Sequence, residues 1–259
     1  MKWNPAPSGH QHLAVANSIG QVQLWSLSFD DATAPQVALQ STIQVEPVED
    51  DVLCLALDFS NRLSSSAAPV SIAVSLSNGH LALIDPATST VTSSWHAHML
   101  ETWSTAFDPH SNASTLYSGA DDTHFSVWDT RSLARSATNS RGHQAGVTYI
   151  APSLVDECLV VTGSYDEYVR VWDKRQLRMP VREIGPIGGG AWRVRFDPNA
   201  PRSRVVVAGM HAGFFVVTHK YEGHESLAYG VDWCGDGWGK VASCSFYDHA
   251  LHLWDVEIE

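Results

Sequence analysis

Two histidines in this sequence could do chemistry at turns between strands. His211 lies in the middle of Gly209-Met210-His211-Ala212-Gly213, and His249 follows Asp248 in a second turn pattern. An exposed imidazole can take a proton from water and release it again near neutral pH. No Gly-x-Ser-x-Gly elbow, which would indicate a serine nucleophile, occurs in the chain. We therefore take His211 and His249 as candidate general bases.

Three large aromatic residues stand near the beginning of apolar strand patterns: Trp103, Trp192 and Tyr229. Aromatic ring faces attract cations, above all quaternary ammonium groups, so the three could form a substrate-binding site. The alternative is that they pack between neighbouring sheets, where aromatic residues bury a large area. The formal net charge of −12 favours a cationic ligand, and it serves solubility equally well.

The elements that must position these residues follow a repeated phrase. Residues 118–129, 162–173 and 243–255 each read as a turn, an alternating strand and a final Trp-Asp. Trp128 and Trp172 are 44 residues apart, within the ~40–45-residue period of WD40 repeats. Counting weaker copies, repeats end near Trp25, Ile84, Trp128, Trp172, Val216 and Trp254. The repeat predicts an all-β WD40 β-propeller over residues 1–259 as a single domain.

Each strong repeat also contains the polar tetrad that is typical of WD40 blades. The predicted sets are His143, Thr162, Asp166 and Trp172; His224, Ser243, Asp248 and Trp254; and His98 (or His96), Ser118, Asp122 and Trp128. A buried polar network is stable only if every member is paired, so we expect these residues to be structural. His252 alternates with two leucines and is expected to face solvent.

The two ends of the sequence indicate an incomplete ring. Residues 1–5 resemble the first strand of a blade, whereas the last Trp-Asp lies almost at the C-terminus. We therefore expect six recognisable blades of a seven-bladed ring that is incomplete at its N-terminus; the alternative is a genuine six-bladed ring. Residues 30–51 are rich in acidic residues and proline, and are expected to form an exposed connection between blades.

Composition excludes several classes of function. Sixteen basic against 28 acidic residues disfavour nucleic acid as a direct partner. The four cysteines have no metal-ligand spacing, so neither a metal nor a cofactor is expected. No apolar run approaches the ~20 residues that a membrane span requires, and no signal peptide opens the chain. These features predict a cytoplasmic monomer.

The C-terminal half contains a more specific pattern. It comprises residues 189–193 (Gly-Gly-Ala-Trp-Arg), 210–214 (Met-His-Ala-Gly-Phe), 226–233 (Ser-Leu-Ala-Tyr-Gly-Val-Asp-Trp) and 244–254, which begins Cys-Ser-Phe-Tyr-Asp-His. In this order the motifs resemble the WD40 proteins of diphthamide biosynthesis, the diphthine methyl esterase family. The resemblance runs over residues 95–255, and more loosely back to residue 1. Members of this family have a further N-terminal blade.

The resemblance implies an enzyme that acts on a protein substrate, translation elongation factor 2. It would hydrolyse the methyl ester of methylated diphthine to diphthine and methanol, without a cofactor. The resemblance does not assign catalytic residues. It agrees with the aromatic residues on one point, since methylated diphthine carries a trimethylammonium group. The alternative is a non-catalytic WD40 scaffold that binds a basic protein partner, and a third reading is a shortened chain without function.

Overall fold

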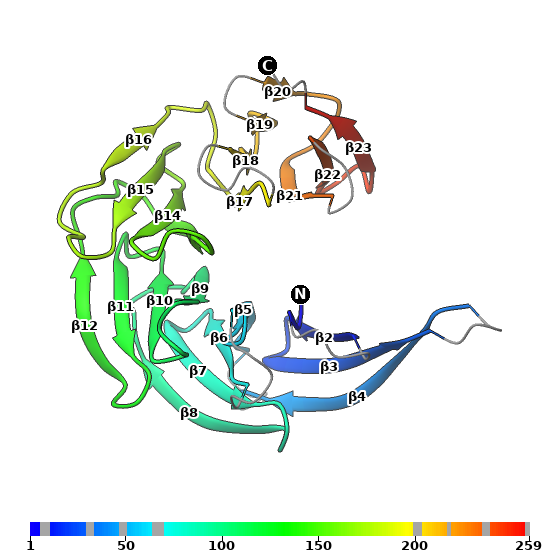
Figure 1. Ribbon diagram of the computed structural model, residues 1–259, viewed down its shortest axis with the longest axis vertical. Helices are drawn as coiled ribbons and strands as arrows, with labels where there is room; N and C mark the ends of the chain where they lie inside the picture. Colours follow the sequence, from blue (N-terminus) through cyan, green and yellow to red (C-terminus); the bar gives the residue numbers. More distant parts are fainter. Residues whose placement is uncertain are drawn as a thin grey trace. The chain divides into compact units, whose positions relative to one another are not determined.

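A computed structural model describes residues 1–5, 11–29, 34–46, 51–63, 70–198, 204–216, 219–234 and 239–256. The chain divides into two compact units, residues 1–138 and 139–259. Figure 1 shows that the strands of each unit follow one another in chain order. They form three antiparallel sheets per unit, which we call blades 1 to 3 and blades 4 to 6.

The first unit holds three four-stranded blades. Blade 1 consists of β1 (Lys2–Trp3), β2 (Gln11–Ala16), β3 (Gln21–Ser28) and β4 (Gln36–Gln44). Blade 2 consists of β5 (Cys54–Phe59), β6 (Ile72–Leu76), β7 (His80–Asp85) and β8 (Thr90–His96). Blade 3 consists of β9 (Ser104–Phe107), β10 (Thr115–Gly119), β11 (Phe125–Asp129) and β12 (Ala134–Asn139).

The second unit holds two four-stranded blades and one blade with three described strands. Blade 4 consists of β13 (Val147–Pro152), β14 (Leu159–Ser164), β15 (Val169–Asp173) and β16 (Arg182–Ile184). Blade 5 consists of β17 (Arg193–Phe196), β18 (Val205–Ala208), β19 (Phe214–Val216) and β20 (His219–Tyr221). Blade 6 consists of β21 (Ala228–Trp233), β22 (Lys240–Ser245) and β23 (Leu251–Asp255).

The strands form where the sequence alternates apolar and polar residues between turn residues. The turn at Asn78-Gly79 illustrates the reason, because Gly79 has φ +83°, which residues with a Cβ rarely adopt. A side chain there would also overlap the backbone carbonyl of His98. The hairpin between the second and third strand of a blade, which we call the inner hairpin, therefore closes tightly.

The apolar cores lie between successive blades within each unit. Val22 and Ile43 of blade 1 share one cluster with Ile72 and Ile84 of blade 2. In the second unit, Phe214 of blade 5 packs in a cluster with Trp233 and Trp254 of blade 6, among other residues. Burial of these side chains supplies the main favourable free energy of folding, because a single sheet cannot cover its own faces.

These blades confirm the predicted all-β propeller fold class. The N-terminal segment does form the first strand of a blade, and blade 6 has three strands among the described residues. A seventh blade stays a prediction. Within residues 30–51, expected to connect blades, Gln36–Gln44 forms the mostly exposed strand β4. No helix of the described residues is long and apolar enough to cross a membrane.

Candidate functional site

The three predicted binding aromatics occupy equivalent positions in their blades. Each precedes a residue that pairs with the beginning of the inner hairpin of the same blade. These pairs are Ser104 with Gly119, Arg193 with Ala208, and Gly230 with Cys244. Because the positions match, Trp103, Trp192 and Tyr229 each lie at the end of the blade that carries its inner hairpin.

The structure brings two of these aromatics into contact within the second unit. The ring centroids of Trp192 and Tyr229 are 5.0 Å apart. Tyr165 extends this contact on the side of Trp192, with 5.9 Å between ring centroids. Phe246 extends it on the side of Tyr229 at 5.1 Å, and Tyr247 lies 4.7 Å beyond Phe246. We call these five residues, which come from blades 4, 5 and 6, the aromatic row.

The aromatic row is open to solvent at one end. Phe246 is 48% exposed and Tyr247 is 71% exposed, whereas Trp192 and Tyr229 are half-buried. Burial raises the pKa of Tyr229, so its phenol stays protonated at neutral pH. Trp103 belongs to the first unit, where its indole Nε1 donates a hydrogen bond to Asp121 at 3.1 Å.

His211 lies in the inner hairpin of blade 5 and is exposed to solvent. This turn is closed by the backbone N–H of Gly209, which donates to the carbonyl of Gly213 at 2.8 Å. A hydrogen bond joins this turn to the aromatic row. The backbone N–H of Ala228, the neighbour of Tyr229, donates to the carbonyl of Met210. A Cβ at Gly189 would overlap the carbonyl of Gly209, so only glycine permits this close approach.

His249 lies in the inner hairpin of blade 6 and is exposed, with φ +54°. This hairpin is one residue longer than the others. Cys244 pairs with Leu251, seven positions away, whereas Gly163 of blade 4 pairs with Val169, six positions away. The additional residue falls before Asp248, so the turn presents two adjacent aromatic residues, Phe246 and Tyr247, beside the histidine.

Blade 3 contains a complete tetrad, and it uses His98 rather than His96. Trp128 Nε1 donates to Ser118 Oγ at 2.7 Å, and Ser118 Oγ lies 2.7 Å from His98 Nε2. His98 Nδ1 lies 3.1 Å from both carboxylate oxygens of Asp122. Burial alone would raise the pKa of Asp122, but these contacts and two backbone N–H donors hold it well below its usual value.

The blade 6 tetrad also forms, with looser geometry. Trp254 Nε1 donates to Ser243 Oγ at 3.0 Å, and that hydroxyl lies 2.9 Å from His224 Nε2. His224 Nδ1 is 3.4 Å from Asp248, and the hydroxyl of Ser245 bridges the two side chains. Both tetrads tie the inner hairpin to the segment before the blade, which supports their predicted structural role.

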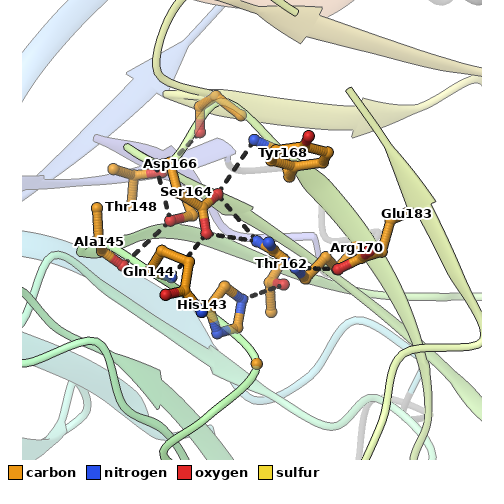
Figure 2. A network of polar contacts seen from close by, with 12 residues as sticks. His143, Gln144, Ala145, Thr148, Thr162, Ser164, Asp166, Tyr168, Arg170 and Glu183 are labelled. Carbon is orange, nitrogen blue, oxygen red and sulfur yellow. Dashed lines mark hydrogen bonds and ion pairs between the residues drawn. The ribbon is translucent and has the colours of Figure 1, made fainter. Parts of the chain in front are cut away.

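In blade 4 the predicted tetrad is wrong in one contact, the one between Asp166 and His143. Thr162 Oγ1 joins His143 Nε2 at 2.9 Å and Trp172 Nε1 at 2.8 Å, but Asp166 does not contact the histidine. Figure 2 shows that Asp166 instead faces Arg170, whose Nη1 lies 2.9 and 2.8 Å from its two carboxylate oxygens. The guanidinium competes successfully because two charge-assisted hydrogen bonds outweigh one from a neutral imidazole.

This exchange of partners leaves His143 without a hydrogen bond to a carboxylate. The residue is 3% exposed, and its Nδ1 has no hydrogen-bond partner among the described residues. Burial and the positive charge of Arg170 lower the pKa of His143 to about 3, although Asp166 opposes the shift. His143 therefore stays neutral over the physiological pH range.

The expectation that His252 faces solvent is also wrong. Its ring stacks on that of His224, with 4.0 Å between centroids, and its Nδ1 lies 2.9 Å from the hydroxyl of Tyr221. Burial and the neighbouring His252 lower the pKa of His224. The contact therefore favours the neutral form of His224.

Sequence reasoning missed Tyr165, Phe246 and Tyr247. A signal for two of them exists in the repeat, because Tyr165 and Phe246 each stand two positions after the residue that opens the inner hairpin. Tyr165 meets Trp192, at the start of the first strand of the next blade, whereas Phe246 meets Tyr229 in its own blade. Among the described residues, no three histidine, cysteine, aspartate or glutamate side chains gather closely enough to hold a metal ion.

Comparison with known proteins agrees with this geometry. Residues 135–173 match the family model "WD domain, G-beta repeat". The chain is 30% identical over 288 residues to the "Diphthine methyltransferase homolog" of Dictyostelium discoideum, covering 98% of this chain and 75% of that protein. It is 29% identical to the "Diphthine methyltransferase" of Schizosaccharomyces pombe, over 98% of this chain and 77% of that protein.

A mammalian relative is longer. The chain is 33% identical to the "Diphthine methyltransferase" of Mus musculus over 254 residues, and spans 52% of its length. The shared WD40 blades and the extent of the alignment to the Dictyostelium discoideum protein show that the chain belongs to the diphthine methyltransferase family of WD40-repeat proteins.

Proposed function

We propose that this protein hydrolyses the methyl ester of methylated diphthine on translation elongation factor 2, a step of diphthamide biosynthesis. The relatives carry the name diphthine methyltransferase, which connects them with diphthine and a methyl group. Hydrolysis of the methyl ester, with water adding to the carbonyl carbon and methanol leaving, gives diphthine and methanol. The observation that carries the proposal is the aromatic row lying beside two turns that present exposed histidines. Such a substrate places the protein in the cytoplasm.

The aromatic row would recognise the trimethylammonium group of the substrate. Trp192 and Tyr229 touch each other, so the cation does not fit between them and must lie along the open side of the row. There it would meet the exposed faces of Phe246 and Tyr247, where cation–π attraction is available to a methylated ammonium ion. A role for Trp103 in binding stays a prediction of the sequence.

His211 or His249 would act as the general base. The imidazole takes a proton from water, and the water oxygen forms a bond to the ester carbonyl carbon. The tetrahedral intermediate then collapses, the bond to the methoxy oxygen breaks, and the protonated imidazole returns its proton to that oxygen. The products are a carboxylate with its released proton and methanol, so no further reactant is required.

The first test is the mass of the substrate. Incubation with elongation factor 2 that carries the diphthine methyl ester should remove about 14 mass units, one methylene, as seen by mass spectrometry of the modified peptide. Binding of the substrate without this loss would contradict the esterase and favour the alternative of a non-catalytic scaffold.

A second test addresses the aromatic row. Trp192→Ala should lower kcat/KM for the methylated substrate about fivefold, because Tyr229 loses the ring that supports it and the row loses the equivalent of one cation–π face, about 1 kcal/mol. Trp192→Phe should retain most of the activity. Trp3→Ala, which removes an exposed tryptophan of blade 1, is the matched control. Equal kcat/KM for Trp192→Ala and the control would remove the row from substrate binding.

A third test separates the two histidines. Loss of a general base lowers kcat by about 10²- to 10⁴-fold, so either His211→Ala or His249→Ala should show this effect with little change in KM. His110→Ala, at an exposed position of blade 3, controls for the loss of a surface imidazole. If both variants keep the kcat of the wild type, neither histidine is the base.

A further inference from the structure

Strand β16 forms the outer edge of blade 4, in the sheet order β13-β14-β15-β16. All three of its residues are exposed, and so is Val181, which precedes it with 65% exposure. Among the described residues no further strand pairs with its outer side. An open edge of this kind offers backbone N–H and C=O groups to an added strand.

On one face of the blade, this edge borders an apolar cavity of about 260 Å³. Alternate residues of the last two strands line it: Val169 and Val171 from β15, and Arg182 and Ile184 from β16. Blade 5 closes the cavity with further apolar side chains, Phe196, Val205, Val207 and Phe215. A cavity of this size and character accepts an apolar side chain.

On the opposite face, the same edge borders a groove of about 750 Å³. Its lining includes four arginines, Arg141, Arg170, Arg178 and Arg182, and one carboxylate, Glu183. Because side chains alternate across a strand, Arg170 and Glu183 lie on this face, whereas Val171 and Ile184 face the apolar cavity. Arg182, at the strand edge, borders both surfaces. The two surfaces therefore differ in chemistry and share a single strand edge.

The groove is positively charged although the whole chain carries a net charge of −12. The charge of Arg170 is neutralised by Asp166 and by Glu183. The Oε1 atom of Glu183 lies 2.7 Å from the Nε atom of Arg170. Arg141, Arg178 and Arg182 make no ion pair with a described carboxylate. The exposed guanidinium groups of Arg141 and Arg178 in this groove, with exposed Arg182 at its border, attract a ligand that carries several carboxylates.

From these three observations we infer that β16 is a docking edge for an extended acidic segment of a partner protein, in which acidic and apolar residues alternate. The segment adds as a fifth strand to blade 4. Its apolar side chains enter the cavity beside Val171 and Ile184, and its carboxylates meet the arginines of the groove. The alternation in the ligand follows from the two-residue period of a strand. This inference is independent of the proposed esterase activity.

The test uses three labelled peptides and the full chain. The first is a seven-residue peptide in which glutamate alternates with leucine; fluorescence anisotropy should show saturable binding. A peptide of the same composition with its leucines adjacent should bind at least about tenfold more weakly, about 1.4 kcal/mol. A third peptide, N-methylated at every second residue, should lose binding because it lacks the donors for strand pairing.

Two protein variants locate the site. Arg182→Glu should weaken binding of the alternating peptide about tenfold, since it replaces an attraction with a repulsion. Arg131→Glu reverses an exposed charge in blade 3 and should leave binding unchanged. Circular dichroism of both variants confirms that they fold. Equal binding to the two variants, equal binding of all three peptides, or no saturable binding to the wild type would each overturn the inference.

Discussion

At the scale of single residues, Arg170 explains why blade 4 differs from blades 3 and 6. Its side chain is almost fully buried and engages Asp166, which the repeat would assign to His143. The corresponding position in blade 3 is occupied by Ser126, which follows Phe125 as Arg170 follows Val169 and is too short to reach the turn aspartate. One long cationic side chain is therefore sufficient to rearrange a tetrad.

Replacing Arg170 should reveal this competition. Arg170→Met should reduce the free energy of unfolding by about 3 kcal/mol, because the carboxylate of Asp166 loses its buried counter-charge. It should also raise the pKa of His143, since the positive charge of Arg170 contributes to lowering it. Chemical denaturation measures the first effect and an NMR titration of the histidine measures the second. An unchanged pKa of His143 would contradict the assigned role of Arg170.

At the scale of elements, the first unit depends on a buried carboxylate that joins strands of three blades. Asp58 of β5 is 1% exposed and accepts hydrogen bonds from Lys2 of β1 at 2.9 Å and from the backbone N–H of Phe107 of β9 at 2.9 Å. Arg62 adds an ion pair at 2.6 Å. Burial opposes ionisation, but these contacts together hold the pKa of Asp58 below its usual value.

Neutralising this carboxylate should loosen the first unit. We expect Asp58→Asn to lower the free energy of unfolding by about 3 kcal/mol, as removal of one partner leaves the remaining charges uncompensated. Urea denaturation at neutral pH measures the effect. Asp129→Asn, which breaks an exposed pair with Arg131, should change stability little. A similar midpoint for both variants would show that Asp58 does not hold the blades together.

At the scale of the whole molecule, buried neutral histidines make stability depend on pH. The pKa of His143 is about 3 in the folded chain and near 6.5 in an unfolded one. Below about pH 6.5 the unfolded chain binds a proton that the folded chain does not. The free energy of unfolding therefore falls as pH decreases, by up to about 1.4 kcal/mol per pH unit, until folded His143 is protonated near pH 3.

The variant His143→Gln should reduce this slope between about pH 6.5 and pH 4, as measured by denaturant unfolding at several pH values. His110→Gln, at an exposed site, is the control for the loss of a histidine side chain. His224, whose pKa is also lowered, should continue to contribute in both variants. If His143→Gln shows the same pH dependence as the wild type, His143 is protonated in the folded chain.

Much of the fold could be predicted from the sequence because its determinants are local. Alternating residues, turn residues and the Trp-Asp phrase lie within single hairpins, and the observed registers place Trp103, Trp192 and Tyr229 at equivalent positions. The candidate site was predicted only in part. The position of an aromatic residue within a blade follows from alternation, but its contacts depend on the neighbouring blade.

The sequence by itself determined the blades, the structural role of the histidines in blades 3 and 6, and the candidate histidines at turn tips. Only the tertiary structure decided that Trp192 and Tyr229 contact each other, that Asp166 pairs with Arg170 and not with His143, and that His252 stacks on His224. The physical reason is that strand periodicity acts over a few residues along the chain. Which of several side chains becomes the partner depends on side-chain length, charge and burial. These are set only when the sheets pack together.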